Sequence, residues 1–238
     1  MTAVRRATPS TRVVRAALGR ARFRFEAGQS AMIGLDGSAE RVPYSLACSP
    51  EESREGGYLE FLIKVEPAGR WGHAFDRLAR GQRLAVRGPF GSFVLPSRRL
   101  REPLLFVAGG TGIAPIRAMV AHALRRPHGP VRVVYSARTV SDFAYARELR
   151  ALARRGLIEV RFHATRDAPG AWRGVRGRIT PAHLAPIVDD RSTLCFVCGP
   201  AAMVADIPVM LQRAGVPRGN ITLEQWGRRP LTRPDSQW

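Results

Sequence analysis

Two glycine-rich turns carry the residues best suited to chemistry. The first, Ala108-Gly-Gly-Thr-Gly-Ile-Ala-Pro115, follows a strand-like segment at 103–108 and opens a helix-like segment at 113–124. Glycines let a backbone approach a ligand closely, and the free N–H groups at a helix N-terminus attract phosphate. Pro115 suits the first turn of a helix, where its missing N–H costs nothing. We therefore expect this turn to bind a pyrophosphate; the alternative is a tight turn that binds nothing.

A second turn of the same kind lies further along the chain. Cys198-Gly-Pro200 follows a strand-like segment at 193–197 and precedes a helix-like one at 202–214. In open α/β sheets, ligands bind at the carboxyl ends of the strands. Two glycine turns at that edge of one sheet are harder to explain by packing alone, so together they favour a nucleotide site.

The second half of the chain alternates strand-like and helix-like segments, which is typical of a doubly wound parallel sheet. The expected strands cover 103–108, 131–136, 158–164, 193–197 and 220–225, and the expected helices cover 113–124, 142–154, 181–188 and 202–214. Pro208 falls inside the last helical pattern and is expected to kink that helix or to reset its start.

The first half has a different pattern, with short apolar or alternating runs separated by turn residues. These runs cover 12–17, 22–25, 30–35, 58–65 and 83–87, and one helix-like stretch covers 71–80. Several short strands with regular turns indicate an antiparallel β-barrel. The change of pattern predicts two domains, residues 1–98 and 99–238, joined by a basic linker at 96–102.

The composition excludes several classes of function. The chain has 238 residues, of which 45% are hydrophobic and 24% charged, as in ordinary globular proteins. No apolar run approaches the roughly 20 residues that span a bilayer, and the first residues do not resemble a signal peptide. We therefore expect a cytoplasmic protein that binds no membrane. The net charge of +19 comes from scattered arginines, with Lys64 as the only lysine, and no basic stripe with interleaved aromatics indicates nucleic-acid binding.

The cysteines do not indicate a metal site. Cys195 and Cys198 form a C-x-x-C pair, but Cys195 falls inside an apolar strand, and strand residues three apart point to opposite faces. Cys48 is the only other cysteine, so the four thiolates of a plant-type iron–sulfur cluster cannot come from this chain alone.

Several motifs occur in the order found in the ferredoxin–NADP reductase family, which the chain resembles from about residue 11 to residue 226. The motifs of the first half are Gly28-Gln29, Arg41-Val-Pro-Tyr-Ser-Leu46, Gly69-Arg-Trp-Gly-His73 and Gly88-Pro-Phe-Gly-Ser-Phe93. Those of the second half are the turn ending at Pro115, Tyr135-Ser-Ala-Arg138, Cys198-Gly-Pro200 with Met203, and Glu224-Gln-Trp226. The series implies a flavin-binding β-barrel followed by a nicotinamide-binding α/β domain.

This resemblance implies that the first half binds FAD, with FMN less expected. Tyr44 would lie against the isoalloxazine ring, the Ser45 hydroxyl would bond near flavin N5, and Arg41 would pair with a flavin phosphate. Gly72 and His73 would present N–H groups of a helix start to a flavin phosphate. The remaining residues implied at the cofactor are Pro43, Ile63, Val65 and Trp226.

The resemblance also implies how the second half binds NADPH or NADH. Thr111 and Cys198 would flank the nicotinamide over the flavin, because hydride transfer needs the two rings in close contact. Ser136 and Arg138 would lie beside a ribose or phosphate of the dinucleotide. The other implied nucleotide-binding residues are Gly110, Gly112, Pro115, Gly199, Pro200 and Met203. The implied catalytic residues are Ser45, Cys198 and Glu224.

The chain departs from the family pattern at two places. Two residues separate Arg41 from Tyr44 where the family has one, so Arg24 or Arg54 could reach the flavin phosphate instead. Gly72-His73 stands where the family usually carries a serine. For the nucleotide, basic side chains at Arg138, Arg166 and Arg173 leave both NADPH and NADH open.

The implied function is electron transfer from NADPH or NADH through bound FAD to a one-electron acceptor. Because no iron–sulfur domain is expected in the chain, the acceptor would be a separate ferredoxin or an oxygenase component. Two alternatives stay open: an NAD(P)H:flavin reductase, and a flavin-binding electron-transfer subunit of a larger complex. A third, a nucleotide-binding module without redox activity, is disfavoured by Tyr44-Ser45.

Overall fold

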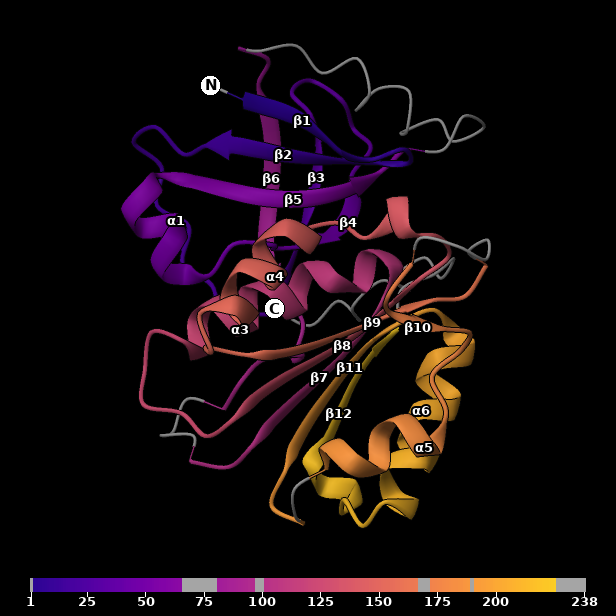
Figure 1. Ribbon diagram of the computed structural model, residues 1–238. Helices are drawn as coiled ribbons and strands as arrows, with labels where there is room; N and C mark the ends of the chain where they lie inside the picture. The colour runs from indigo at the N-terminus through magenta and orange to yellow at the C-terminus, as the bar shows by residue number, and fades with distance from the viewer. Residues whose placement is uncertain (1, 66–80, 97–100, 167–171, 189–190, 226–238) are drawn as a thin grey trace.

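The computed structural model describes residues 2–65, 81–96, 101–166, 172–188 and 191–225. The first half forms two three-stranded antiparallel sheets (Figure 1). One has the order β1-β2-β5, with β1 at Thr2–Thr8, β2 at Thr11–Ala17 and β5 at Tyr58–Lys64. The other has the order β4-β3-β6, with β4 at Val42–Ser45, β3 at Ser30–Leu35 and β6 at Leu84–Phe90. A single bridge between Leu46 and Phe61 links the two sheets, as the expected barrel requires.

The strand β5 is buried on both faces, which explains its nearly continuous apolar run. Alternate residues of a strand point to opposite faces. Phe61 and Ile63 therefore point into the core between the two antiparallel sheets, where they meet Val14 of β2. Leu62 belongs to the other core, which the first half shares with the second. One strand thus serves both halves of the molecule.

The second half is a six-stranded parallel sheet of order β10-β9-β8-β7-β11-β12. Its strands are β7 (Leu104–Gly109), β8 (Val131–Ala137), β9 (Glu159–Ala164), β10 (Val175–Arg176), β11 (Leu194–Gly199) and β12 (Ile221–Gln225). From β7 the chain first builds outward through β8, β9 and β10, and then returns to place β11 on the other side of β7. The point where the order reverses therefore lies between β7 and β11.

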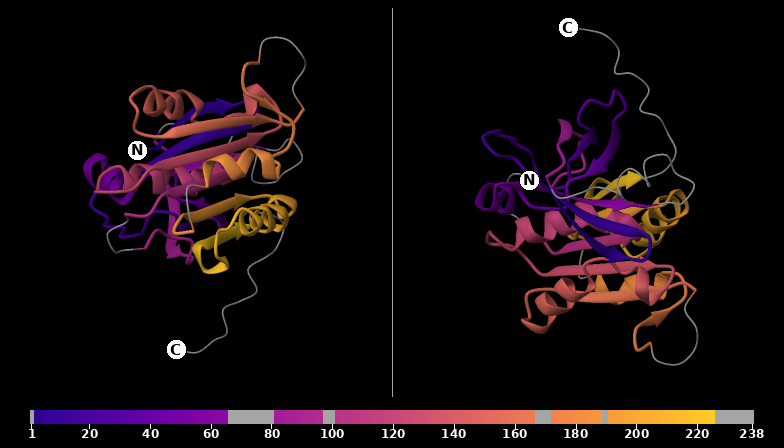
Figure 2. Two further views of the ribbon diagram at one scale, coloured as in Figure 1. Left: turned by 60° about the horizontal axis from the view of Figure 1, so that its bottom comes forward. Right: turned by 90° about the horizontal axis from the view of Figure 1, so that it is seen from above.

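Helices cover both faces of this sheet (Figures 1 and 2). The helix α3 (Ile113–Ala123) and the helix α4 (Ala146–Arg154) lie on the face towards the antiparallel sheets, and their apolar residues join the shared core. The short α5 (Pro181–Leu184) and α6 (Ala201–Arg213) cover the opposite face through a separate core. This layered arrangement is the doubly wound fold expected from the sequence.

Most expected elements of the second half are confirmed to within a few residues, and the differences have local causes. The helix expected from 142 begins at Ala146, because Tyr145 before it has a left-handed backbone with φ of 58°. Of the two effects expected of Pro208, the reset of the helix start is wrong, since α6 runs continuously from Ala201 to Arg213 with Pro208 inside it; the kink stays a prediction.

The first half differs more from the expectation. The strand expected at 22–25 is absent: Phe23 and Phe25 pack on the core while Arg22 and Arg24 are exposed, but the backbone joins no sheet. A helix that was not expected, α1 (Pro50–Gly56), follows β4 and starts with a capping box between Ser49 and Glu52. The helix expected at 71–80 and the boundary at 98/99 lie outside the described residues.

A buried histidine makes the parallel sheet sensitive to acid. His163 of β9 is fully buried, and neither ring nitrogen has a hydrogen-bond partner among the described residues. Its ring lies edge-on to that of His183 in α5, with 4.7 Å between the centroids. Burial, together with the neighbouring His183 and Arg161, lowers the pKa of His163 from 6.5 to about 4.

We expect His163 to reduce the stability of the fold as the pH falls. Because its pKa is lower in the folded chain, the unfolded chain takes up the proton first, and stability present above pH 6.5 is lost towards pH 4. Between pH 7 and pH 5 the loss amounts to about 2 kcal/mol. Urea denaturation at both pH values measures it, with His163→Leu as the comparison. Equal pH dependence of the two proteins would contradict this assignment.

Candidate functional site

The two glycine turns lie side by side at the point where the strand order reverses. Strands β7 and β11 are parallel neighbours, and Ala108 is opposite Cys198. A side chain on Gly112 would collide with the carbonyl of Cys198, and one on Gly199 would come within 2.7 Å of the Met203 sulfur. The absence of side chains at Gly112 and Gly199 therefore lets the protein's own turns pack closely. Gly110 has a left-handed backbone, with φ of 55°.

A cavity of about 440 Å³ opens beside these turns, at the carboxyl ends of the parallel strands. Six residues expected at the nucleotide line it: Gly110, Thr111, Ser136, Arg138, Pro200 and Met203. Pro115, in contrast, is buried inside α3. The volume and the position match a nucleotide site at the reversal point of a parallel sheet.

The cavity also has residues that the sequence analysis did not assign. The antiparallel domain supplies Ser10, Thr11, Leu62 and Lys64, and the parallel domain adds Thr165, Arg178 and Asp206. Arg166, which the sequence offered as a candidate, lines the cavity, whereas Arg173 is not among the lining residues. Lys64 lies between Ile63 and Val65, which the sequence analysis assigned to the cofactor. That assignment was the only sequence signal near Lys64.

The three expected catalytic residues come together, although none of them lines the cavity; the nearest lining residue in the chain is Pro200, two residues after Cys198. Cys198 and Glu224 are directly paired across β11 and β12. The Cys198 thiol donates to Glu224 Oε2 over 3.5 Å, and the Ser45 hydroxyl also bonds to the Glu224 carboxyl. Ser45 is the last residue of β4 in the first half of the chain. The contact between Ser45 and Glu224 thus joins the two halves at a cluster of proton-bearing groups.

Burial changes the protonation of this cluster. It raises the pKa of Glu224 from 4.5 to about 7, while hydrogen bonds from Cys198 and Ser45 act in the opposite direction. Burial and the neighbouring Glu224 also raise the pKa of the Cys198 thiol well above its usual value. Near neutral pH the Cys198 thiol therefore keeps its proton, and the Glu224 carboxyl is present in both its protonated and its ionised form.

The other residues expected at the flavin have varied surroundings. Tyr44 is half-buried against the core of the antiparallel sheets, and Pro43 beside it is exposed. The Arg41 guanidinium donates to the carbonyls of Ser38 and Glu40 in its own turn.

Ile63 and Val65, the two expected residues at the end of β5, also differ in their surroundings. The Ile63 side chain is fully buried in the core, so only its backbone is available to a ligand. The Val65 N–H donates to the Ser10 carbonyl over 2.8 Å. Gly72, His73 and Trp226 lie outside the described residues.

The described residues contain neither a group of histidines, cysteines and carboxylates that could hold a metal ion nor a helix long and apolar enough to cross a membrane.

Comparisons with known proteins agree with this geometry. Residues 1–95 match the model of an oxidoreductase FAD-binding domain, and residues 106–208 match that of an oxidoreductase NAD-binding domain. A ferredoxin–NADP reductase B of Sorangium cellulosum is 32% identical over 86% of this chain and 86% of that protein. The chain belongs to the ferredoxin–NADP reductase family.

Two further similar proteins are longer than this chain. The reductase component of a propane 2-monooxygenase from Mycolicibacterium goodii is 31% identical over 84% of this chain. The chain spans only 58% of that component's length. The solved structure of a ferredoxin reductase in carbazole 1,9a-dioxygenase is 28% identical, with a TM-score of 0.81 over 94% of this chain and 67% of that one.

We expect Ser45→Ala to raise the pKa of Glu224 above about 7, because the variant removes a hydrogen bond that favours the carboxylate. The shift should be about one unit, as for other hydrogen bonds to charged groups. The pH dependence of the Glu224 carboxyl carbon-13 resonance measures it, with Glu224→Gln to assign the signal. Ser38→Ala, in an exposed turn, serves as the control. Identical Glu224 titrations in the wild type, Ser45→Ala and Ser38→Ala would contradict the hydrogen bond between Ser45 and Glu224.

Proposed function

We propose that the chain is a flavin-dependent NAD(P)H reductase that passes electrons through bound FAD to a separate one-electron acceptor protein. The observation that carries the proposal is the meeting of Ser45, Cys198 and Glu224 beside a nucleotide-sized cavity. Neither half of the chain supplies all three residues, so the cluster exists only where a flavin-type domain and a nicotinamide-type domain meet.

The residues at this junction fit the two cofactors. Bound FAD supplies the redox chemistry, since a flavin accepts two electrons from a nicotinamide and releases them one at a time. Tyr44, half-buried, offers a ring face to the flavin, and Ser45 offers a hydroxyl. Thr111 borders the cavity, and Cys198 faces Glu224 at its side, so these residues orient the nicotinamide and exclude water. Glu224 holds a proton at its carboxyl close to the Ser45 hydroxyl.

The arginines of the cavity favour NADPH over NADH. Arg138, Arg166 and Arg178 come from three different segments and line the same cavity. No carboxylate pairs with any of the three within the part of the chain that the structure describes. Ser136 and Thr165 beside them offer hydroxyls for a ribose. Guanidinium groups without carboxylate partners suit a phosphate monoester, and the 2′-phosphate is what distinguishes NADPH from NADH.

The acceptor is expected to be an acidic protein. Relatives of the chain are reductase components of monooxygenases and ferredoxin reductases. The net charge of +19 would attract an acidic ferredoxin or oxygenase component and accelerate their encounter. An acceptor of that kind fits the one-electron steps that a flavin allows.

Anaerobic titration of the purified, FAD-loaded protein with NADPH and then NADH tests the proposed reaction. We expect the visible flavin absorption to bleach at close to one nucleotide per flavin. Retention of the flavin through gel filtration would exclude a flavin reductase that uses flavin as a loosely held substrate. A protein that neither retains FAD nor supports bleaching would contradict the proposal.

Arg166→Gln tests the choice of nucleotide. Removing one guanidinium from the 2′-phosphate should raise the KM for NADPH by about tenfold, because a charge-assisted hydrogen bond contributes about 1.5–3 kcal/mol. The KM for NADH should stay within about twofold, since NADH lacks that phosphate. Arg147→Gln is the matched control, because Arg147 is exposed on α4 and does not line the cavity. Equal effects on both nucleotides would contradict the assignment.

A further inference from the structure

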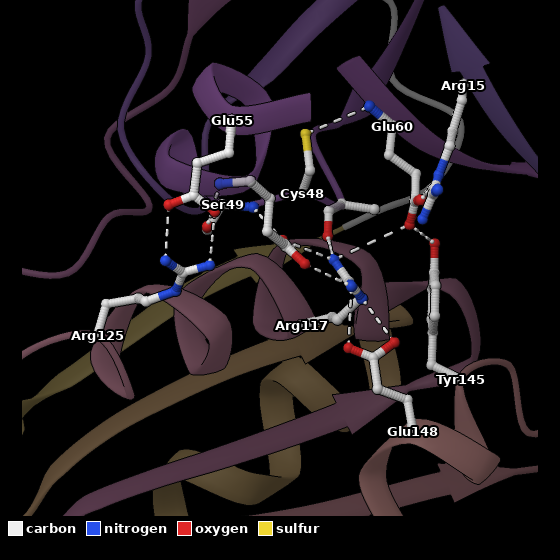
Figure 3. A network of polar contacts seen from close by, with 11 residues as sticks. Arg15, Cys48, Ser49, Glu55, Glu60, Arg117, Arg125, Tyr145 and Glu148 are labelled. Atoms are coloured by element: carbon white, nitrogen blue, oxygen red, sulfur yellow. Dashed lines mark hydrogen bonds and ion pairs between the residues drawn. The ribbon is translucent and has the colours of Figure 1, made fainter. Parts of the chain in front are cut away.

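Arg117 of α3 is a buried cation between the two halves of the chain, with its side chain only 7% exposed. Its guanidinium uses all five N–H donors (Figure 3). Nη1 and Nη2 donate to the two oxygens of Glu52 at 3.0 and 2.8 Å. Nε and Nη2 contact the two oxygens of Glu148 at 3.0 and 2.9 Å. Nη1 also donates to the Ala47 carbonyl over 2.7 Å.

These partners come from separate segments around the interface. Glu52 belongs to α1 and Ala47 to the stretch between β4 and α1, both in the first half of the chain. Glu148 belongs to α4 of the second half. Burial alone would lower the pKa of Arg117, but its contacts with Glu148 and Glu52 raise it above the ordinary value, so the residue stays charged.

A second layer of charged and polar groups surrounds this arginine. The fully buried Glu60 of β5 lies 3.9 Å from Arg117 Nη1. Glu60 accepts hydrogen bonds from Arg15 over 2.6 Å and from the Tyr145 hydroxyl over 2.9 Å. The Glu60 carbonyl in turn accepts the Ala47 N–H over 2.8 Å. Both polar groups of the Ala47 backbone are therefore held, one by Arg117 and the other by β5.

The connection runs directly between the two expected cofactor sites. Ala47 follows Ser45 by two residues, and Glu52 also accepts the Ser49 N–H over 2.7 Å, so Arg117 contacts both ends of the stretch 47–52. On the other side, α3 begins at Ile113, directly after the turn that holds Thr111. A rigid helix and one guanidinium thus link the residue expected at the flavin to the turn expected at the nicotinamide.

Two neighbouring ion pairs also join α1 to the region of α3, but neither binds the Ala47 carbonyl. Arg125 forms a two-pronged pair with Glu55, and His122 bonds to Glu51. Arg125 and Glu55 are 46% and 60% exposed, and exposed pairs contribute little stability. Glu51 also bonds to the Ser49 side chain, but among the described residues no contact of either pair reaches the Ala47 carbonyl, which Arg117 holds. If the interface only needed α1 and α3 to be held together, these pairs would serve, and a buried guanidinium on the Ala47 carbonyl would be unnecessary.

We propose that Arg117 is a positioning residue, which fixes the flavin strand end at Tyr44-Ser45 relative to the nicotinamide turn at Thr111 and Cys198. The proposal rests on the proposed reductase function. It follows from the planar fork of arginine, which two carboxylates and a carbonyl occupy completely. Lysine carries the same charge but cannot form the two bidentate pairs.

The first test is Arg117→Lys in the FAD-loaded protein, measured by anaerobic stopped-flow reduction with NADPH. We expect the limiting rate constant of flavin reduction to fall roughly 10- to 100-fold, since errors of about 1 Å in the reacting geometry have effects of that size. The nucleotide concentration at half-saturation should change less than threefold, roughly, because the cavity itself is intact. The matched control Arg125→Lys should reduce flavin at the wild-type rate.

A second readout needs neither FAD nor nucleotide. Cys198 is buried at the junction and bonds to Glu224, whereas Cys195 is buried in the separate core under α5 and α6. Looser positioning should speed the alkylation of Cys198 by iodoacetamide, mapped by mass spectrometry, and leave Cys195 unchanged. Equal acceleration at both cysteines would indicate general unfolding and overturn the proposal.

The outcomes separate the two proposals. If the wild-type protein is not reduced by either nucleotide, the proposed function fails, and the alkylation of Cys198 in Arg117→Lys still decides the positioning role. Wild-type reduction rates in Arg117→Lys, or an equal loss in Arg125→Lys, would overturn the positioning role. If Arg117→Lys does not fold, Glu148→Gln is the second variant, because it weakens one of the two bidentate pairs at a partly exposed carboxylate. It must show smaller versions of the slower flavin reduction and the faster Cys198 alkylation. If it shows neither, the proposal is wrong.

Discussion

The relative placement of the two halves depends on burying one guanidinium with every donor satisfied. An arginine can leave water only where carboxylates and carbonyls replace its whole hydration shell. At Arg117 the replacements come from α1, α4 and the stretch after β4, so these segments must converge before the charge can be buried. A shift of any of them would strand a charge in the interface. This requirement gives the interface a single geometry, which apolar packing alone specifies less strictly.

That geometry determines what the strand ends can do together. The register of β11 and β12 places Cys198 opposite Glu224 whatever the first half of the chain does. Ser45, however, reaches Glu224 only if β4 ends at the right place, and Arg117 holds the Ala47 carbonyl two residues further on. Sheet register therefore fixes half of the cluster, and the interface charge fixes the other half. The protonation of Glu224 reflects both parts, because burial raises its pKa while the hydrogen bonds from Cys198 and Ser45 lower it.

The sequence predicted what local patterns control. Glycine turns, strand–helix alternation and motif order were sufficient for the main strands of the parallel sheet and for the part of the cavity that its two glycine turns border. The sequence could not show which side chains of β5 point to which core, because Phe61, Leu62 and Ile63 form an apolar run without alternation. Arg117 had no recognisable signal, since its partners lie 31 to 70 residues away in the chain. The helix α1, in contrast, did have a sequence signal, the capping box formed by Ser49 and Glu52.

The burial of β5 on both faces also explains why the nucleotide cavity is not a property of the second half alone. In β5, Phe61 and Ile63 point to the antiparallel core, so Leu62 and Lys64 must point to the opposite side, where they line the cavity with Ser10 and Thr11. The strand that stabilises one domain thus forms a wall of the other domain's binding site. The pairing of β5 with β2 is regular from Tyr58 to Lys64, so a one-residue shift that turned Lys64 away from the cavity would also turn Ile63 out of the core. At β5, the backbone therefore couples the packing of the core to the shape of the cavity. At Arg117, a buried charge couples the packing of the interface to the placement of the site.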